Sequence, residues 1–406
     1  MKQKLILTLV VVVALLAIAG YATGLIPTTI VAAEIRTNAA AIAPALSAPR
    51  LGTLTDYETA LENVYAQVNP SVVAIEVVTQ QSASSRTPAV PGFRGQQPQL
   101  PQAPVQQALG SGFVWDAQGN IVTNNHVVAD ATRITVTFAD GTIAQAELVG
   151  ADPDSDLAVV KVDLPANQLH PVQVADSNQV KVGQFAIAIG NPFGEQNTMT
   201  TGIVSALGRT LPEGSAAAQG PSYTIPDIIQ TDAPINPGNS GGVLLNSDSK
   251  VIGITAAMES STRSSSGVGF AIPSATAQKV VPALIKTGHF DHPYLGISGG
   301  TLAPSLAQAM NLKADQRGTL VGSVTRGGPA EKAGLRGSTQ PATIDGQSVN
   351  VGGDVIIAFN GTPVKTFNEL VAYLARMDVR QSVTLTILRD GKEQTIQVTL
   401  AARPSA

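Results

Sequence analysis

Short segments rich in valine, isoleucine, threonine and glycine recur through the middle of this chain and constrain its fold more than any other feature. Gly, Asp and Pro punctuate them, and Asp140-Gly141 is typical of a tight hairpin turn. Because β-branched residues favour strands, such closely spaced segments predict a mainly β fold of paired antiparallel barrels. The expected strands cover residues 71–78, 112–115, 120–123, 133–138, 157–162, 185–189, 202–207, 243–245, 251–256 and 268–272.

Composition narrows the classes of function. The chain has 406 residues, a hydrophobic content of 44% and a net charge of −4, which suits two or three packed domains and offers no basic surface for nucleic acid. It contains no cysteine, which excludes a thiol nucleophile and a cysteine-based zinc site. The sequence also lacks a metal-ligand cluster, a phosphate-binding loop and a nucleotide fingerprint, so we expect no cofactor and no metal.

The N-terminus predicts export. Lys2 and Lys4 precede an apolar run that reaches Gly20, a pattern typical of a secretory signal or a membrane anchor. Ala17-Ile18-Ala19 could be a cleavage site, but the length of the run favours a retained signal-anchor over residues 1–24, followed by a spacer over 25–53. We therefore expect the rest of the chain to lie outside the cytoplasm, anchored to the membrane by this segment.

Two further domains are expected beyond the spacer. Residues 54–289 read as the β domain, with a Pro- and Gln-rich mobile loop over 80–109. A helix over 275–286 ends that domain, and residues 290–402 form a small α/β module. Within the module, the segment 336–350 is longer than a compact loop requires.

One serine lies among glycines in the stretch 228–242. Gly238, Gly241 and Gly242 allow the chain to turn tightly around Ser240, so that nearby amides can face one developing oxyanion. The string also fits the nucleophile elbow of α/β-hydrolases, which needs a helix after the serine. Here a hairpin pattern follows instead, which disfavours the elbow.

A serine hydroxyl needs an imidazole and a carboxylate to become a nucleophile. His126, which follows an expected strand, is the best base, since His170, His289 and His292 lie in expected loops. Asp156 adjoins an apolar strand and is the best acid.

The neighbouring Asp152 and Asp154 suit a solvated turn. In chain order, histidine, aspartate and serine follow one another as they do in chymotrypsin.

These segments resemble the catalytic blocks of the HtrA/Deg family of trypsin-fold serine proteases. The resemblance runs from about Leu54 to the C-terminus. The three catalytic blocks are Thr123-Asn124-Asn125-His126-Val127-Val128, Ser155-Asp156-Leu157-Ala158-Val159 and Gly238-Asn239-Ser240-Gly241-Gly242. Further blocks are 110–113, 190–194 and 269–273, and the C-terminal module resembles a single PDZ domain.

The resemblance implies a role for each catalytic residue. Ser240 would attack the scissile carbonyl, His126 would act as general base and then acid, and Asp156 would fix the histidine tautomer. The amides of Gly238 and Ser240, joined by Asn239, would form the oxyanion hole.

Trypsin-like enzymes that cut after basic residues have an acid six positions before the serine, where this chain has Pro234. With Ile235 beside it, we expect an apolar specificity pocket and cleavage after small aliphatic residues.

The resemblance also implies partners. Tyr294-Leu295-Gly296-Ile297 matches the carboxylate-binding loop of a PDZ domain, which captures peptide C-termini. Family members form homotrimers and degrade unfolded exported proteins, and segments 209–223 and 258–267 match their activation loops. Two alternatives stay open: a non-enzymatic chaperone or scaffold that binds exposed C-termini, and a signalling protease with one defined partner.

Overall fold

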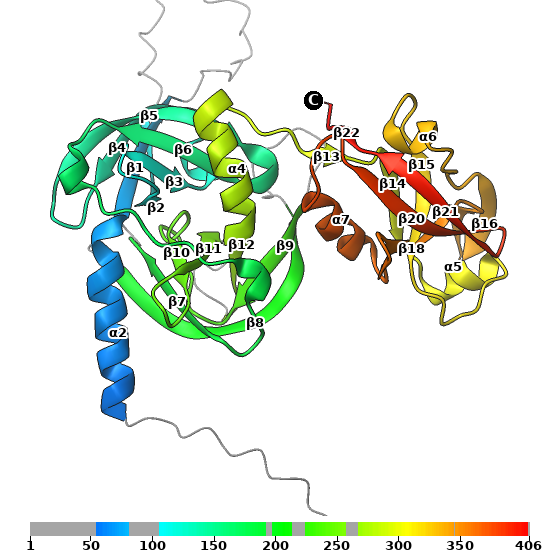
Figure 1. Cartoon of the computed structure of the whole chain (residues 1–406), viewed down its shortest axis with the longest axis horizontal. Helices are drawn as coiled ribbons and strands as arrows, with labels where there is room; N and C mark the ends of the chain where they lie inside the picture. Colours follow the sequence, from blue (N-terminus) through cyan, green and yellow to red (C-terminus); the bar gives the residue numbers. More distant parts are fainter. Residues whose placement is uncertain are drawn as a thin grey trace, which may run out of the picture. The chain divides into compact units, whose positions relative to one another are not determined.

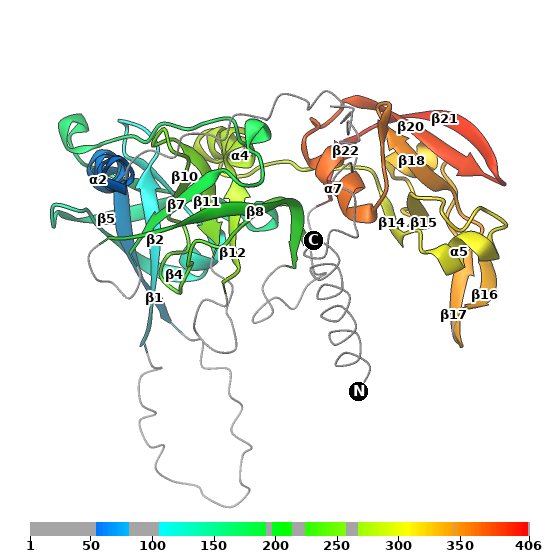
Figure 2. The same ribbon diagram turned by 90° about the horizontal axis from the view of Figure 1, so that it is seen from below.

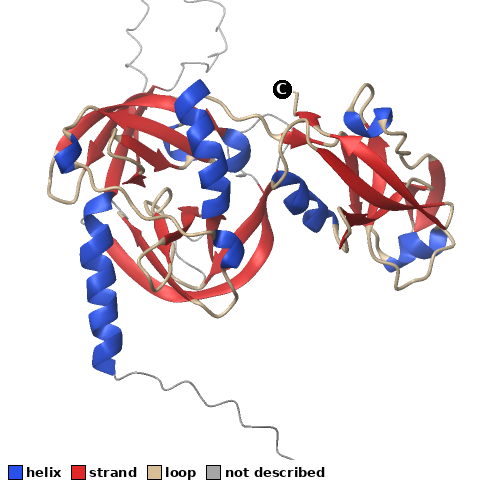
Figure 3. Ribbon diagram, viewed as in Figure 1, coloured by secondary structure: helices blue, strands red, loops and turns tan. Residues whose placement is uncertain are grey.

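The computed structural model describes residues 54–80, 105–191, 197–212, 224–256, 267–344 and 346–404 (Figures 1 and 3). The expected signal-anchor, the spacer and residues 81–104 of the Pro- and Gln-rich loop lie outside the described residues, as do most of the two segments matched to activation loops. The ends of the expected loop, residues 80 and 105–109, belong instead to strands. Within the described ranges, no helix combines the length and apolar character needed to span a membrane.

The first half of the β domain is a closed six-stranded barrel with the order β1-β2-β3-β6-β5-β4. Its interior is filled by alternate aliphatic residues of these strands, among them Val73, Ile75 and Val136. The strands are β1 (Val72–Gln80), β2 (Val105–Val114), β3 (Asn120–Thr123), β4 (Ala131–Thr137), β5 (Ile143–Asp152) and β6 (Leu157–Val162). The Asp140-Gly141 hairpin turn is confirmed between β4 and β5.

The second half repeats this arrangement, in the order β7-β8-β9-β12-β11-β10. The strands are β7 (Phe185–Gly190), β8 (Thr198–Pro212), β9 (Thr224–Thr231), β10 (Val243–Leu245), β11 (Val251–Ala256) and β12 (Gly269–Pro273). The expected pair of antiparallel barrels is confirmed. Sequence reasoning did not identify β5, of whose ten residues only two are buried, or β9, which contains Pro226 and a positive φ of 63° at Asp227.

A shared apolar core joins the barrels. Phe113 and Leu157 from the first barrel pack in one cluster with Ile189 and Val243 from the second. Helix α2 (Leu54–Val68) adds buried valines, and α4 (Ser274–Thr287) contacts β5 and β6 on one side and β11 and β12 on the other (Figure 1). The remaining helices of the β domain are α3 (Asn125–Val128), η1 (Asn69–Ser71), η2 (Pro153–Ser155), η3 (Ala166–Gln168) and η4 (Ser177–Gln179).

The C-terminal module is a sheet in the order β14-β15-β18-β20-β21, with β19 paired to β18, and Figure 2 shows it from below. These strands are β14 (Ile297–Thr301), β15 (Thr319–Val324), β18 (Val355–Phe359), β19 (Thr362–Pro363), β20 (Ser382–Arg389) and β21 (Lys392–Thr399). The helices are α5 (Pro304–Ala309), α6 (Pro329–Lys332) and α7 (Phe367–Ala375). The module opens with β13 (Pro293–Tyr294), which pairs with β22 (Ala401–Ala402).

The long segment 336–350 folds largely into a separate hairpin. Strands β16 (Gln340–Ile344) and β17 (Gln347–Val351) pair antiparallel and form a two-stranded sheet of their own. Half of their residues are polar and exposed and only Val351 is buried, which explains why their sequence did not predict strands.

Candidate active site

Two hydrogen bonds join His126 and Asp156 in the first barrel. The ring Nδ1 of His126 lies 2.7 Å from Oδ2 of Asp156, and the backbone amide of His126 donates to Oδ1 at 2.9 Å. The aspartate side chain is 12% exposed and the histidine side chain 47%. The carboxylate is therefore shielded while about half of the imidazole is exposed, and the two hydrogen bonds fix the orientation of the ring.

Local backbone structure holds this pair in place. Asp156 follows η2 in the left-handed region, with φ of 52°, and its carbonyl accepts from the Asn124 side chain at 2.9 Å and from the Asn125 amide at 3.1 Å. Aspartate tolerates this backbone conformation better than most residues. The loop carrying the acid is thus tied to the start of α3, which carries the histidine.

Ser240 lies in a tight turn before β10 and is 5% exposed. Gly238 and Gly241 flank it with φ values of 95° and 86°, which favour glycine. The Asn239 amide donates to the Asn236 carbonyl at 2.9 Å. That bond directs the Asn239 amide into the turn, so of the three expected oxyanion donors we retain Gly238 and Ser240.

The serine turn packs against the segment that leads to the histidine. A Cβ at Gly241 would lie 2.1 Å from the Ser111 carbonyl oxygen, 2.4 Å from Thr123 Oγ1 and 3.1 Å from the Asn124 amide nitrogen. Asn124 is two residues before His126, so the turn of one barrel meets the catalytic helix of the other. The three expected catalytic segments therefore converge at the junction of the barrels.

Pro234 and Ile235 precede this turn. Pro234 is exposed and its carbonyl accepts from Thr200 Oγ1 at 2.9 Å. Ile235 is 7% exposed and packs with the interior of the second barrel, and a Cβ at Gly269 would lie 2.6 Å from its Cγ1. The absence of an acid at Pro234 is consistent with an apolar pocket, whose specificity stays a prediction.

The expected carboxylate-binding loop is held by backbone bonds. Gly296 has a φ of 81° and its carbonyl accepts from the Thr325 amide at 2.9 Å, while the buried Leu295 accepts from the Ala330 amide at 2.9 Å. The Tyr294 hydroxyl lies 2.8 Å from Thr325 Oγ1. Ile297 then begins β14, the terminal strand of its sheet.

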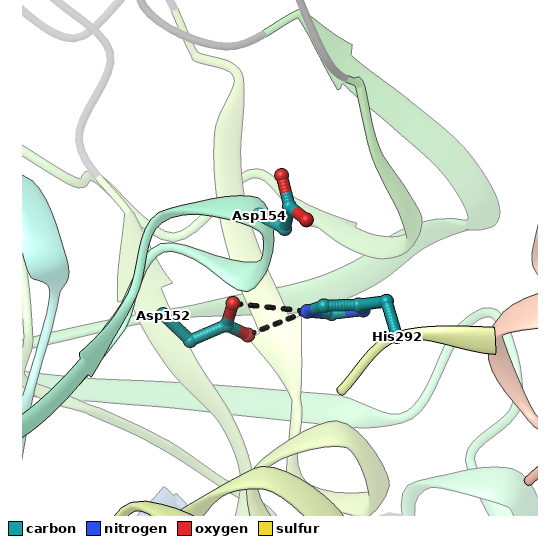
Figure 4. A group of neighbouring side chains, drawn as sticks. All are labelled: Asp152, Asp154 and His292. Atoms are coloured by element: carbon teal, nitrogen blue, oxygen red, sulfur yellow. Dashed lines mark hydrogen bonds and ion pairs between the residues drawn. The ribbon is translucent and has the colours of Figure 1, made fainter. Parts of the chain in front are cut away.

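A cluster that sequence reasoning missed adjoins the acid loop (Figure 4). His292 Nε2 lies 2.8 and 2.9 Å from the two carboxylate oxygens of Asp152, and Arg403 Nη1 donates to Asp154 at 2.7 Å. Asp152 is 4% exposed, so the expectation that it belongs to a solvated turn was wrong. Its desolvated carboxylate is compensated by His292 and by the Ser155 hydroxyl.

Asp152, Asp154 and His292 could also be considered for a metal, since their ligand atoms lie within 4.8 Å of one another. Both carboxylates, however, already have protein partners: His292 and Ser155 at Asp152, and Arg403 at Asp154. We therefore interpret the cluster as an ion-pair network that ties both ends of the C-terminal module to the acid loop. The His292–Asp152 and Arg403–Asp154 pairs join residues 140 and 249 positions apart, a separation that no local pattern reveals.

Comparisons with known proteins agree with this geometry. A trypsin-like peptidase domain matches residues 110–254, which include the histidine, aspartate and serine, and a PDZ domain matches residues 293–400. The chloroplastic Protease Do-like 1 of Arabidopsis thaliana is 44% identical over 300 residues, 74% of this chain and 65% of that protein. The periplasmic pH-dependent serine endoprotease DegQ of Escherichia coli is 38% identical over 344 residues, 84% of this chain and 70% of that protein.

Solved structures point the same way. The HtrA-type protease AlgW, determined with a decapeptide, superposes with a TM-score of 0.64 at 34% identity, covering 85% of this chain and 99% of that one. For the Arabidopsis relative, the match spans just under two thirds of its length. With a double barrel, a matching PDZ domain and this level of identity, the chain belongs to the HtrA-type family of trypsin-fold serine proteases.

Proposed function

We propose that this chain is a serine endopeptidase that degrades or processes unfolded and misfolded proteins outside the cytoplasm. Ser240 attacks the scissile carbonyl, His126 takes the hydroxyl proton and then passes it to the leaving amine, and Asp156 keeps the ring in the required tautomer. The observation that carries this proposal is the His126–Asp156 pair, joined by two hydrogen bonds, beside the Ser240 turn. With Nδ1 directed at the carboxylate, Nε2 is left to act as the base.

The oxyanion forms while the serine attacks, and preorganised amides stabilise it. We assign this role to the amides of Gly238 and Ser240, because the Asn239 amide is already bonded to Asn236. Donors fixed before the reaction need no reorganisation as charge develops, which makes such a hole one of the largest contributions to catalysis.

Labelling with a fluorophosphonate tests the mechanism. We expect wild-type protein to be labelled and Ser240→Ala to be inert, because the reagent bonds only to an activated serine. Ser274→Ala is the matched control, since Ser274 is also buried but its hydroxyl bonds to Ala175 near α4. If wild-type protein stays unlabelled, even with peptide activators, a non-enzymatic chaperone or scaffold replaces the protease.

For specificity, we propose cleavage after small aliphatic residues such as Val, Ala or Ile. The support is Pro234 at the position where basic-specific enzymes carry an acid, together with the apolar Ile235. Mass spectrometry of an unfolded protein digested by wild-type and Ser240→Ala protein identifies the cut sites. Cuts mainly after Lys or Arg would contradict this specificity.

We further propose that peptide C-termini bind the PDZ domain and regulate the protease. The β14 strand lies at the end of its sheet and contacts α7, so its outer edge can accept a peptide strand. The loop from Tyr294 to Ile297 would then hold the carboxylate. A peptide with a free apolar C-terminus should raise the cleavage rate, and the same peptide with an amidated C-terminus should not.

We also propose that the chain forms a trimer, which is supported by exposed apolar residues near the N-terminal end of α2. The rings of Tyr57 and Phe185 contact each other in a tilted arrangement, with centroids 5.7 Å apart, and the two residues are 38% and 49% exposed. Ile203, paired with Phe185 between β7 and β8, is 39% exposed. Sedimentation analysis should give a trimer for wild-type protein and a smaller species for Phe185→Glu. Leu148→Glu, at an exposed position of the other barrel, should leave the trimer intact.

Location outside the cytoplasm rests on the expected N-terminal signal-anchor and on relatives named as periplasmic. We expect the protein to fractionate with membranes and to be digested by protease added to the outer face. Recovery of the full-length chain in the cytosol would contradict this location.

A further inference from the structure

Ser111 lies in β2 of the first barrel, completely buried, and uses each of its polar groups. Its hydroxyl donates to the Gly238 carbonyl at 2.6 Å and accepts from the Asn191 amide at 2.7 Å. Its own amide donates to the Ser240 carbonyl at 2.8 Å, and its carbonyl accepts from Thr123 Oγ1 at 2.7 Å. One side chain and its backbone therefore join both barrels at the serine turn.

Two of these bonds hold the residues on either side of Asn239. The carbonyls of Gly238 and Ser240 both point at Ser111, and the glycine has the φ of 95° that other residues resist. Glycine could otherwise rotate freely, and rotation there would swing its amide away from the substrate. The Ser111 hydroxyl holds the peptide plane between Gly238 and Asn239, so the Gly238 amide in the preceding plane can turn relative to this fixed plane only about the φ and ψ of Gly238.

We propose that Ser111 is a positioning residue that sets the oxyanion hole of the second barrel from the first. The inference rests on the proposed endopeptidase function and adds a residue outside the catalytic trio. Its hydroxyl also accepts from the amide of Asn191, which follows β7. The Ser111 hydroxyl oxygen in β2 therefore contacts both the oxyanion turn and the end of β7. The hole is complete only when the two barrels are packed together.

Removal of the hydroxyl should affect the chemical step more than substrate binding. In Ser111→Ala the Gly238 carbonyl and the Asn191 amide lose a buried partner, and the turn can relax. Loss of an oxyanion donor costs about 100- to 1,000-fold in kcat, and a misplaced donor should cost less, about 10- to 100-fold. We expect KM to stay within about threefold, because the ground-state carbonyl depends little on the hole.

The experiment measures kcat and KM on fluorescein-labelled β-casein, and the rate of fluorophosphonate labelling, with full-length protein. Ser111→Ala should lose kcat and labelling rate by similar factors while KM is retained. Ser274→Ala, which removes a buried hydroxyl that donates to the Ala175 carbonyl at 2.6 Å, should behave like wild type. Ser111→Cys, nearly the same shape with a weaker donor, should fall between the two.

A kcat of Ser111→Ala within twofold of wild type, or a raised KM with unchanged kcat, would overturn the role of Ser111. Thermal unfolding checks that each variant is folded. If Ser111→Ala melts far below wild type, Ser111→Cys decides the matter, since a folded cysteine variant with full kcat and labelling rate also overturns it. Wild-type protein that is never labelled would instead refute the endopeptidase function, so the two failures are distinguishable.

Discussion

The two barrels share a strand order but hold their catalytic residues in different ways. In the first barrel, the His126–Asp156 pair is fixed by bonds from α3 and the preceding Asn124 to the loop before β6, all within that barrel. In the second, the Ser240 turn is bonded to Thr255 of its own barrel and also to Ser111 of the first barrel, which contacts Gly238 and Ser240. The acid and base can thus form with one barrel, whereas the nucleophile and its oxyanion hole require both.

The largest effect is expected from breaking the pair inside the first barrel. Asp156→Asn should lower kcat by about 10⁴-fold, because an amide donor facing Nδ1 favours the wrong histidine tautomer. Steady-state cleavage of an unfolded protein measures this. Asp163→Asn, on an exposed position just after β6, is the control and should retain full activity. A loss below tenfold in Asp156→Asn would remove Asp156 from the mechanism.

Breaking the contact between the barrels should have the next largest effect. A methyl group at Gly241 would meet the Ser111 carbonyl at 2.1 Å, so the serine turn must shift by several tenths of an ångström or more. Since small misplacements of reacting groups can cost about 100-fold, we expect a kcat loss of that order in Gly241→Ala.

Gly208→Ala is the control, because it separates the cost of placing an alanine at a positive φ from the cost of the contact between the barrels. Gly208 also has a positive φ, of 66°, but a Cβ there would meet nothing within 4 Å. Equal kcat values for the two variants would show that the contact between the barrels does not position the serine.

A third region, the PDZ domain, sharpens the comparison because it combines an apolar core with a buried charge pair. Asp354 is 1% exposed and pairs with Arg389 through two bonds of 2.7 Å. The hydrogen bonds that the Arg389 guanidinium donates to this carboxylate raise the pKa of the guanidinium. A raised folded-state pKa gives stability that is present below the unfolded pKa, so the pair is retained until strongly alkaline pH.

Asp354→Asn should therefore lower the free energy of unfolding of the PDZ domain by about 3–5 kcal/mol, because it leaves a partly buried guanidinium without its anion. Denaturant unfolding with domain-specific proteolysis measures this. Asp390→Asn, in the exposed turn after β20, should change little. Unchanged stability of the PDZ domain in Asp354→Asn would contradict the prediction, while fluorophosphonate labelling of Ser240 reports whether the barrels are unaffected.

The smallest effect concerns two exposed turns, one in the first barrel and one before the second. Backbone hydrogen bonds from Thr142 and Asn178 lower the pKa values of Asp140 and Asp176 below their ordinary value of 3.8. A lowered folded-state pKa gives stability that is present above the unfolded pKa and lost as pH falls through the folded one.

Asp140→Ala and Asp176→Ala should thus melt slightly below wild type at pH 7, with the difference shrinking below about pH 4. Thermal unfolding measured against pH tests this in both variants. A difference that persists at pH 2 would show that the stabilisation does not depend on the charged carboxylates.

The sequence predicted the double barrel and the convergence of His126, Asp156 and Ser240. The strands were readable because β-branched runs between turn residues are local patterns. The catalytic residues were identifiable because few side chains can perform acid–base and nucleophilic work, and their order matched a known constellation. By contrast, β9 escaped detection because Pro226 and Asp227 interrupt its pattern, and the β16–β17 hairpin because half of its strand residues are polar and exposed.

Ser111 and His292 show what the sequence left open. Ser111 was visible only as part of a glycine-rich block, and its bond to Gly238 joins residues 127 positions apart. His292 was read as a loop histidine, yet it bonds to Asp152 across 140 positions. Neither partner could be deduced, since no local preference specifies which distant group a side chain will meet.

The sequence by itself determined the strands, the tight glycine turn around Ser240 and the chemical types able to act as nucleophile, base and acid. Backbone preferences and hydrogen bonds between near neighbours are sufficient for these features. The tertiary structure alone decided that Ser111 would hold the oxyanion turn and that Asp152 would be buried against His292. These contacts exist only after two barrels close and pack over a shared apolar core, which brings distant polar groups together and removes the water that would otherwise bind them.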